Sequence, residues 1–95
     1  MRLCYKGSLR ALRGPGMAFK EDEGAFDDKH IGSFLRFAIE DYALRINSIT
    51  PEGISFTIRK GLRNDQDFFI KSGETLEYKQ EGNAAGFEYL FRVEV

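Results

Sequence analysis

The stretch from Tyr42 to Lys60 constrains the fold of this chain more than any other part of the sequence. It contains two runs rich in β-branched and aromatic residues, separated by Pro51-Glu52-Gly53. Proline presets the backbone angle of a turn's second position, and glycine accepts a positive φ without steric cost. A three-residue loop of this kind typically combines a type I turn with a glycine bulge. The stretch therefore predicts a β-hairpin with its turn at these three residues.

The loop length sets the register of the hairpin, with Thr50 opposite Ile54, and side chains then alternate between two faces. One face is apolar except for Ser48, and its large side chains are Leu44, Ile46, Ile54, Phe56 and Ile58. The other face is polar except for Ile49, and it includes Arg45, Asn47, Thr57 and Arg59. A shift by one residue would move the apolar set into water, so we expect that set to be buried.

The rest of the chain is also rich in strand-forming residues. Nine Phe and four Tyr contribute to a hydrophobic content of 42%, which is enough to build a core. The C-terminal segment alternates polar residues with Phe87, Tyr89, Phe91, Val93 and Val95, as a half-buried antiparallel strand does. Two further short strands are predicted at residues 68–71 and 75–79. We predict a mainly β protein, a small antiparallel barrel or sandwich of about six strands.

Residues 31–42 fit two structures. Their apolar spacing suits one face of a helix, with Asp27 or Asp28 as the N-terminal cap. The alternation from Leu35 to Ile39 suits a strand, which we favour because the rest of the chain is β in composition. The alternative is an α+β fold, in which one helix at about residues 28–42 packs on a five-stranded antiparallel sheet.

Charge divides the chain near residue 16. Residues 1–16 carry four basic side chains and no acid, and because the whole chain has a net charge of −1, residues 17–95 carry −5. Gly14-Pro15-Gly16 breaks regular structure, and Met17 follows directly as an alternative start. We predict a peripheral basic leader at residues 1–16 and a single β-rich domain at residues 17–95. The mildly acidic body argues against nucleic-acid binding.

Composition also bears on where the protein works. No apolar run approaches the roughly 18 residues that a membrane-spanning helix needs, and no secretory signal is visible. Cys4 is the one cysteine, which excludes an intrachain disulfide and a cysteine-based metal site. We predict a cytoplasmic protein that has no membrane contact.

Few residues suggest catalysis. His30 lies near Asp27 and Asp28, but the spacing matches neither a calcium loop nor a zinc site. Cys4 would be a nucleophile only with a base beside it. No serine lies in a nucleophile elbow, and no glycine-rich loop has the phosphate-binding pattern. We therefore predict no enzyme, cofactor or metal site, and favour a small protein-interaction or assembly module.

Two arginines suggest an alternative function. In the predicted register Arg45 and Arg59 lie directly opposite each other, where like charges are mildly destabilising. They could hold an anionic ligand or a nucleic-acid segment, with Asn47 and Thr57 alongside. Alternatively, each arginine pairs with a carboxylate from a neighbouring strand, and the candidates are Glu77, Glu88 and Glu94.

The C-terminal strand suggests a way to assemble. Its polar face alternates Arg92 with Glu94. If this strand forms the edge of a sheet, Arg92 would meet Glu94 of an antiparallel second copy. We therefore predict a protein partner, or a homodimer formed through the C-terminal strand.

Overall fold

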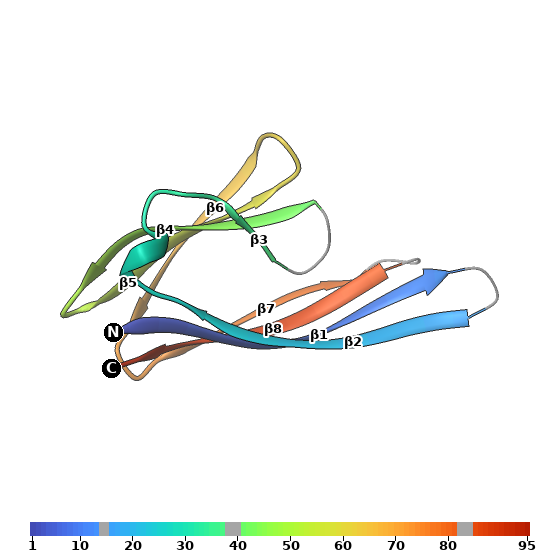
Figure 1. Cartoon of the computed structure of the whole chain (residues 1–95), viewed down its shortest axis with the longest axis horizontal. Helices are drawn as coiled ribbons and strands as arrows, with labels where there is room; N and C mark the ends of the chain where they lie inside the picture. Colours follow the sequence, from blue (N-terminus) through green and yellow to red (C-terminus); the bar gives the residue numbers. More distant parts are fainter. Residues whose placement is uncertain (14–15, 38–40, 82–84) are drawn as a thin grey trace.

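The computed structural model describes residues 1–13, 16–37, 41–81 and 85–95. Within them the chain forms strands that build two sheets (Figure 1), together with one short 3₁₀ helix, η1 (Asp28–His30). The strands are β1 (Arg2–Arg13), β2 (Gly16–Phe26), β3 (Leu35–Arg36), β4 (Tyr42–Thr50), β5 (Gly53–Lys60), β6 (Asn64–Lys71), β7 (Thr75–Glu81) and β8 (Ala85–Glu94).

The two sheets are antiparallel and four-stranded. Sheet A has the strand order β2-β1-β8-β7, and sheet B has the order β3-β4-β5-β6. The chain builds the first half of sheet A, crosses to sheet B, and returns to complete sheet A, so both termini lie at the same end of the molecule (Figure 1). The prediction of a mainly β sandwich is confirmed, with sheets that do not close into a barrel. The described residues contain no α-helix, so the α+β alternative is wrong for them.

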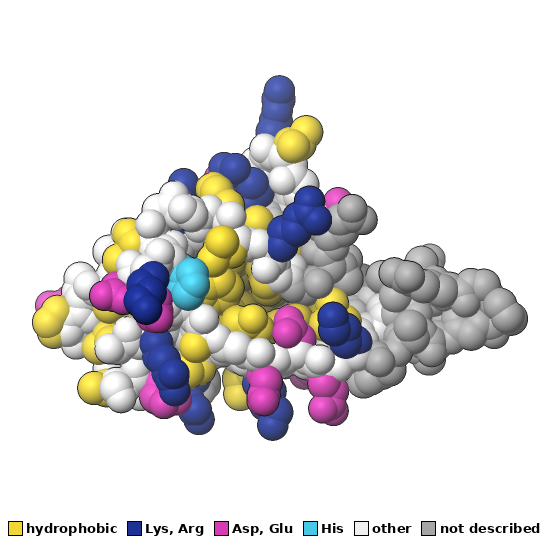
Figure 2. Space-filling view, in the orientation of Figure 1, with side chains coloured by type: hydrophobic (Ala, Val, Ile, Leu, Met, Phe, Trp, Pro, Cys, Tyr) yellow, Lys and Arg dark blue, Asp and Glu magenta, His cyan; other side chains and the backbone are white. Residues whose placement is uncertain are grey.

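The core lies between the sheets, and both contribute to it. The predicted apolar face of the hairpin is confirmed, since each of its members is at most 1% exposed: Leu44, Ile46, Ile54, Phe56 and Ile58. The alternation of β8 is confirmed at Phe87, Tyr89, Phe91 and Val93, which are buried, while Val95 is 91% exposed. Figure 2 shows apolar side chains between the two layers and charged side chains along the outer side of the lower layer.

The hairpin turn is tighter than predicted. Thr50 pairs with Gly53, which leaves Pro51 and Glu52 as the connection. Gly53 does not have a positive φ, so the predicted glycine bulge is absent there. Glycine is needed for a different reason, because a Cβ at this position would collide with the backbone oxygen of Ile70 in β6. Gly53 therefore allows β5 and β6 to approach each other closely.

β1 lies inside sheet A, and this differs from the expected peripheral leader. It pairs with β2 on one side and β8 on the other. Leu3 is fully buried, opposite Phe26 and Val93. The basic side chains of Arg2, Lys6 and Arg10 are exposed and lie on the face of β1 opposite to Leu3. The net charge of the segment does not distinguish these two faces, so it does not reveal that one of them is buried.

Residues 31–42 form little regular structure where they are described. The predicted strand is matched at Leu35–Arg36, and residues 38–40 lie outside the described residues. Asp27 does act as a cap, but of η1: its carboxylate accepts the N–H of Lys29 at 2.9 Å. The imidazole Nδ1 of His30 accepts the N–H of Asp27 at 3.0 Å and completes a capping box.

The C-terminal strand is not an edge. β8 lies between β1 and β7, and it pairs with β1 from Ala85 to Glu94 and with β7 from Gly86 to Arg92. Its backbone groups are therefore used within the chain. The premise of a dimer formed through this strand is wrong, and the edges of the two sheets are β2, β7, β3 and β6.

Gly7 provides a direct test of packing within sheet A. The ring of Tyr89 lies over it, so that a Cβ on residue 7 would lie 2.6 Å from the ring and 2.7 Å from the carbonyl oxygen of Glu88. The Tyr89 hydroxyl donates to Asp22 at 2.7 Å, which holds the ring in place. We expect Gly7→Val to lower the free energy of unfolding by about 1–3 kcal/mol through overpacking.

Urea denaturation measures this effect. Ser8→Val is the matched control, because it adds a β-branched side chain to the other face of the same strand, where Ser8 is only half-buried. Equal midpoints for the two variants would show that Tyr89 does not occupy the space over Gly7.

Candidate functional site

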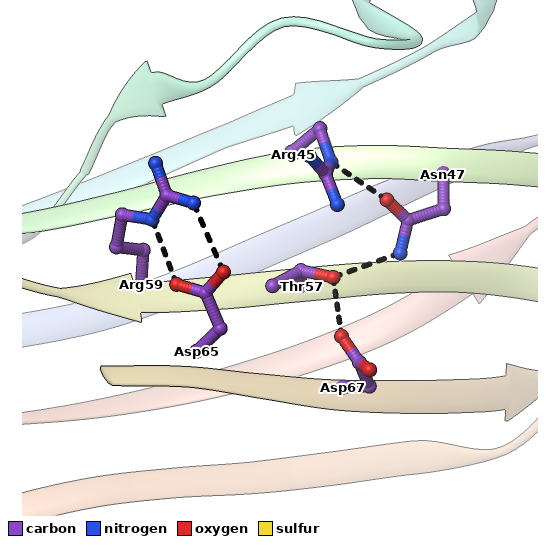
Figure 3. A network of polar contacts seen from close by, with 6 residues as sticks. All are labelled: Arg45, Asn47, Thr57, Arg59, Asp65 and Asp67. Atoms are coloured by element: carbon purple, nitrogen blue, oxygen red, sulfur yellow. Dashed lines mark hydrogen bonds and ion pairs between the residues drawn. The ribbon is translucent and has the colours of Figure 1, made fainter. Parts of the chain in front are cut away.

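The outer face of sheet B brings the four predicted site residues together (Figure 3). Arg45 and Asn47 come from β4, and Thr57 and Arg59 come from β5. The register differs from the prediction by two residues, because the turn is one residue shorter and the ladder shifts again between Ile46 and Ser48, which leaves Asn47 as a bulge. As a result Arg45 lies opposite Thr57, and the predicted like-charge pair of arginines does not form.

A buried hydroxyl organises the network. Thr57 is 1% exposed, and its Oγ1 donates to Oδ1 of Asp67 at 2.6 Å. The same oxygen accepts from Nδ2 of Asn47 at 2.9 Å, and Oδ1 of Asn47 accepts from Nε of Arg45 at 2.8 Å. This chain of hydrogen bonds links β4, β5 and β6, and it satisfies a hydroxyl that would be costly to bury alone.

Arg59 is paired with Asp65 of β6. Its Nε donates to Oδ1 at 2.7 Å and its Nη2 to Oδ2 at 3.0 Å, which is the bidentate geometry that favours arginine over lysine. The predicted partners Glu77, Glu88 and Glu94 are wrong, since all three lie in sheet A. The true partner, Asp65, lies before the short strand predicted at residues 68–71, in the part of β6 that was not predicted.

Phe34 joins the site without having been predicted. The Cζ atom of Arg59 lies 4.0 Å from the centre of its ring, and that of Arg45 lies 4.7 Å from it. Two guanidinium groups therefore stack on one aromatic ring, which attaches the segment before β3 to the face of the sheet. The sequence signal is weak, because Phe34 directly precedes the alternation from Leu35 to Ile39 and would lie on its polar side.

The ion pair changes the titration of Asp65. Hydrogen bonds from Arg59 lower the pKa of its carboxyl below the ordinary value of 3.8, and the charge of Arg45 adds a smaller effect. The stabilisation by the pair is therefore complete above about pH 3.8 and is lost as the pH falls through the lowered pKa of the folded state. NMR titration of Asp65 should give a midpoint below 3.8 that moves back toward it in Arg59→Gln.

Arg45→Gln is the control for that titration. It removes a nearby charge without removing a hydrogen bond to Asp65, so the midpoint should move less than in Arg59→Gln. Equal midpoints in the two variants would contradict the dominance of the bidentate pair.

Most polar groups of this face are thus committed to one another. The charge of Arg59 is matched by Asp65, and Asp67 accepts from Thr57. Arg45 has no carboxylate within ion-pair distance among the described residues. The arrangement is a structural network that holds four segments together, and Arg45 takes part in it through Asn47 and Phe34.

The two residues considered for catalysis lie in different elements, Cys4 in β1 and His30 in η1. The Cys4 thiol donates to Oε2 of Glu94 at 3.4 Å, and burial, with help from that carboxylate, raises its pKa. His30 lies in the cap of η1. No group of three or more His, Cys, Asp or Glu side chains suited to a metal ion occurs in the described part of the chain.

A second feature of sheet B is the free edge of β6. β5 is the one strand that pairs with it among the described residues. The N–H of Ser72 donates to the carbonyl of Glu52 at 3.3 Å, and hydrogen-bonded pairs alternate along an antiparallel ladder. Ile70, Phe68 and Gln66 therefore bond to β5, while the backbone groups of Asp65, Asp67 and Phe69 point outward from the edge.

The turn after β6 closes one end of this edge. The N–H of Lys71 donates to Oε1 of Glu74 at 3.0 Å, so a side chain of the following turn covers that group. Phe69 is 51% exposed although it is a large aromatic residue in the middle of regular structure. The open part of the edge is thus a short run from Asp65 to Phe69 with an aromatic side chain near one end.

Comparisons with known proteins assign no class to this chain. No family model matches it, and no match was found among curated proteins or solved structures. Among the described residues, no helix has the length and apolar character needed to cross a membrane.

Proposed function

We propose that this chain is a non-enzymatic protein-interaction module that binds an extended segment of a partner protein as an added strand on β6. The observation that carries the proposal is the open edge from Asp65 to Phe69, with outward backbone groups and a half-exposed aromatic side chain. Strand addition gains affinity from main-chain hydrogen bonds and specificity from alternate side chains.

The side chains beside the edge indicate what the added segment carries. Asp65, Asp67 and Phe69 project from the same face, because they alternate along one strand. A segment that alternates apolar and basic residues would place an apolar group against Phe69 and a cation near Asp67. Charge and an aromatic anchor then select the partner, while the backbone pairing holds it.

The chain's one cysteine adds a point about location. Cys4 has a free thiol, and unpaired thiols are typical of reducing compartments. We propose the cytoplasm as the place where the module works.

A peptide selection tests the proposed function. A random peptide library displayed on phage and selected on the immobilised chain should yield segments with alternating basic and apolar residues. Selected peptides should shift the amide resonances of Asp67 and Phe69 more than those of Phe68 and Ile70, whose N–H groups bond to β5. Shifts confined to another part of the chain would overturn the proposal.

Two variants sharpen this test. Phe69→Lys should weaken binding of the selected peptides by about tenfold or more, because it removes the aromatic anchor and adds a charge. Leu62→Lys makes the same change of charge at another exposed apolar residue, which is 92% exposed in the turn before β6. Equal losses in both variants would show that the edge is not the binding site.

Anion binding is the second candidate, and Arg45 supports it because its guanidinium has no carboxylate partner among the described residues. Titration with inorganic phosphate would then shift the Nε–H resonance of Arg45 in a saturable way, and Arg45→Gln would abolish the binding. Arg59 would respond less, since Asp65 already occupies it.

A further inference from the structure

We infer that the segment added to β6 is the β6 strand of a second copy of this chain, in an antiparallel pairing with the two-fold axis at Phe69. This inference rests on the proposed function and names its partner. It follows from three properties of the edge: which backbone groups point outward, which side chains lie beside them, and which residues lie opposite each other when β6 pairs with a copy of itself.

Backbone geometry limits the possible registers. Two antiparallel strands form hydrogen bonds only where outward-facing residues meet outward-facing residues. On β6 these are Asp65, Asp67, Phe69 and Lys71, by alternation from the bond between Ser72 and Glu52. A symmetric pair of edges must therefore be centred on Asp67, Phe68 or Phe69 if it is to use most of the strand.

Side-chain chemistry distinguishes these three registers. Centring on Asp67 places two carboxylates opposite each other. Centring on Phe68 places Phe69 opposite Asp67 of the other copy, and it sets Lys71 opposite Asp65, which is already paired with Arg59. Centring on Phe69 places the aromatic side chain against its own copy and Asp67 opposite Lys71 on both sides. That third register has an apolar centre and two pairs of opposite charge, so it matches the strand to itself best.

The backbone fits the same register. Phe69 and its copy would exchange two hydrogen bonds. The carbonyl of Lys71 already accepts the N–H of Glu74 at 3.0 Å, so each Asp67 N–H would share that carbonyl in the other copy through its second lone pair, giving about four bonds between the copies. The N–H of Lys71 can keep its present acceptor, Oε1 of Glu74. The pairing joins two copies of sheet B into one continuous sheet and removes the open edge of each copy.

Analytical ultracentrifugation provides the first test. The expected mass rises with concentration from 10.9 kDa toward twice that value. Lys71→Glu should raise the dissociation constant by about tenfold or more, because it sets two acids opposite each other at two symmetric sites. Lys60→Glu is the matched control, since Lys60 is exposed at the end of β5 and has no place in the pairing.

A double-mutant cycle tests the register. Asp67→Asn removes the charge and keeps an oxygen for the Thr57 hydroxyl, so the fold is preserved. In that background Lys71→Glu should weaken the dimer much less than in the native chain. Coupling of Lys71 to Asp65 in place of Asp67 would overturn the Phe69-centred register in favour of the Phe68-centred one.

Cross-linking gives an independent readout. In a Cys4→Ser background, Phe69→Cys should form an intermolecular disulfide on mild oxidation, because residues of a hydrogen-bonded pair lie about 5.5 Å apart at Cα. Val95→Cys, at a terminal residue that is 91% exposed, reports random collisions and should react more slowly. Equal rates, or a mass of 10.9 kDa at every concentration, would overturn the dimer. The peptide selection judges the proposed function separately, since peptide binding to a monomer would preserve it.

Discussion

A chain shortened to begin at Met17 is expected not to fold. The deletion removes β1, which lies between β2 and β8. The β1–β2 and β1–β8 pairings are both lost, so β2 no longer has a partner strand. It also removes Leu3, which is fully buried in the core. A small domain is stable by only about 5–15 kcal/mol, and the loss of an interior strand exceeds that margin.

Circular dichroism and amide dispersion in NMR spectra measure the outcome. The control is a full-length chain with Lys6→Gln and Arg10→Gln, which removes charge from β1 without removing its pairing; it should unfold cooperatively like the native protein. A shortened chain with dispersed amide resonances and a cooperative transition would contradict the interior position of β1.

Phe56→Ala is expected to lower the free energy of unfolding by about 3–5 kcal/mol. The Phe56 side chain is fully buried, and its ring centre lies 5.4 Å from that of Phe68 in its own sheet and 5.4 Å from that of Phe91 in sheet A. The substitution thus opens a cavity at the contact between the two layers.

Guanidinium denaturation compares this variant with Phe69→Ala. Phe69 is 51% exposed on the other face of its strand, so its removal should change the stability of the monomer by only about 0.5 kcal/mol. If the two substitutions were equally destabilising at a protein concentration that keeps the chain monomeric, Phe56 would not form the link between the sheets.

The buried face of the hairpin was predictable because it depends on a period of two. The turn shifts the pairing by one residue and the bulge at Asn47 shifts it by one more, so the total shift of two residues returns each side chain to the predicted face. The sequence also contains an indication of the bulge. Ser48 and Ile49 occupied the wrong faces of a regular ladder, and an extra residue before them places Ile49 against the core.

The position of β1 and the contacts of the site were not predictable by the same means. Net charge along residues 1–16 averages over two faces, and it hides the burial of Leu3. Asn64-Asp65 is turn-prone in sequence and precedes the short strand predicted at residues 68–71, yet Asp65 lies in β6 and pairs with Arg59. The stacking of both arginines on Phe34 joins segments that local patterns do not relate. The sequence predicted four members of the site, Arg45, Asn47, Thr57 and Arg59, and the long-range pairing of strands set their partners.

Amide hydrogen exchange along β6, at two protein concentrations, tests the central claim most directly. At low concentration Gln66, Phe68 and Ile70 should exchange slowly and Asp67 and Phe69 quickly, since only the first set bonds to β5. At high concentration Asp67 and Phe69 should become protected as well. Slow exchange of Asp67 and Phe69 already at low concentration would show that the edge is covered within one chain and would contradict the proposed function. Fast exchange of these two amides at both concentrations would contradict the second copy as the partner.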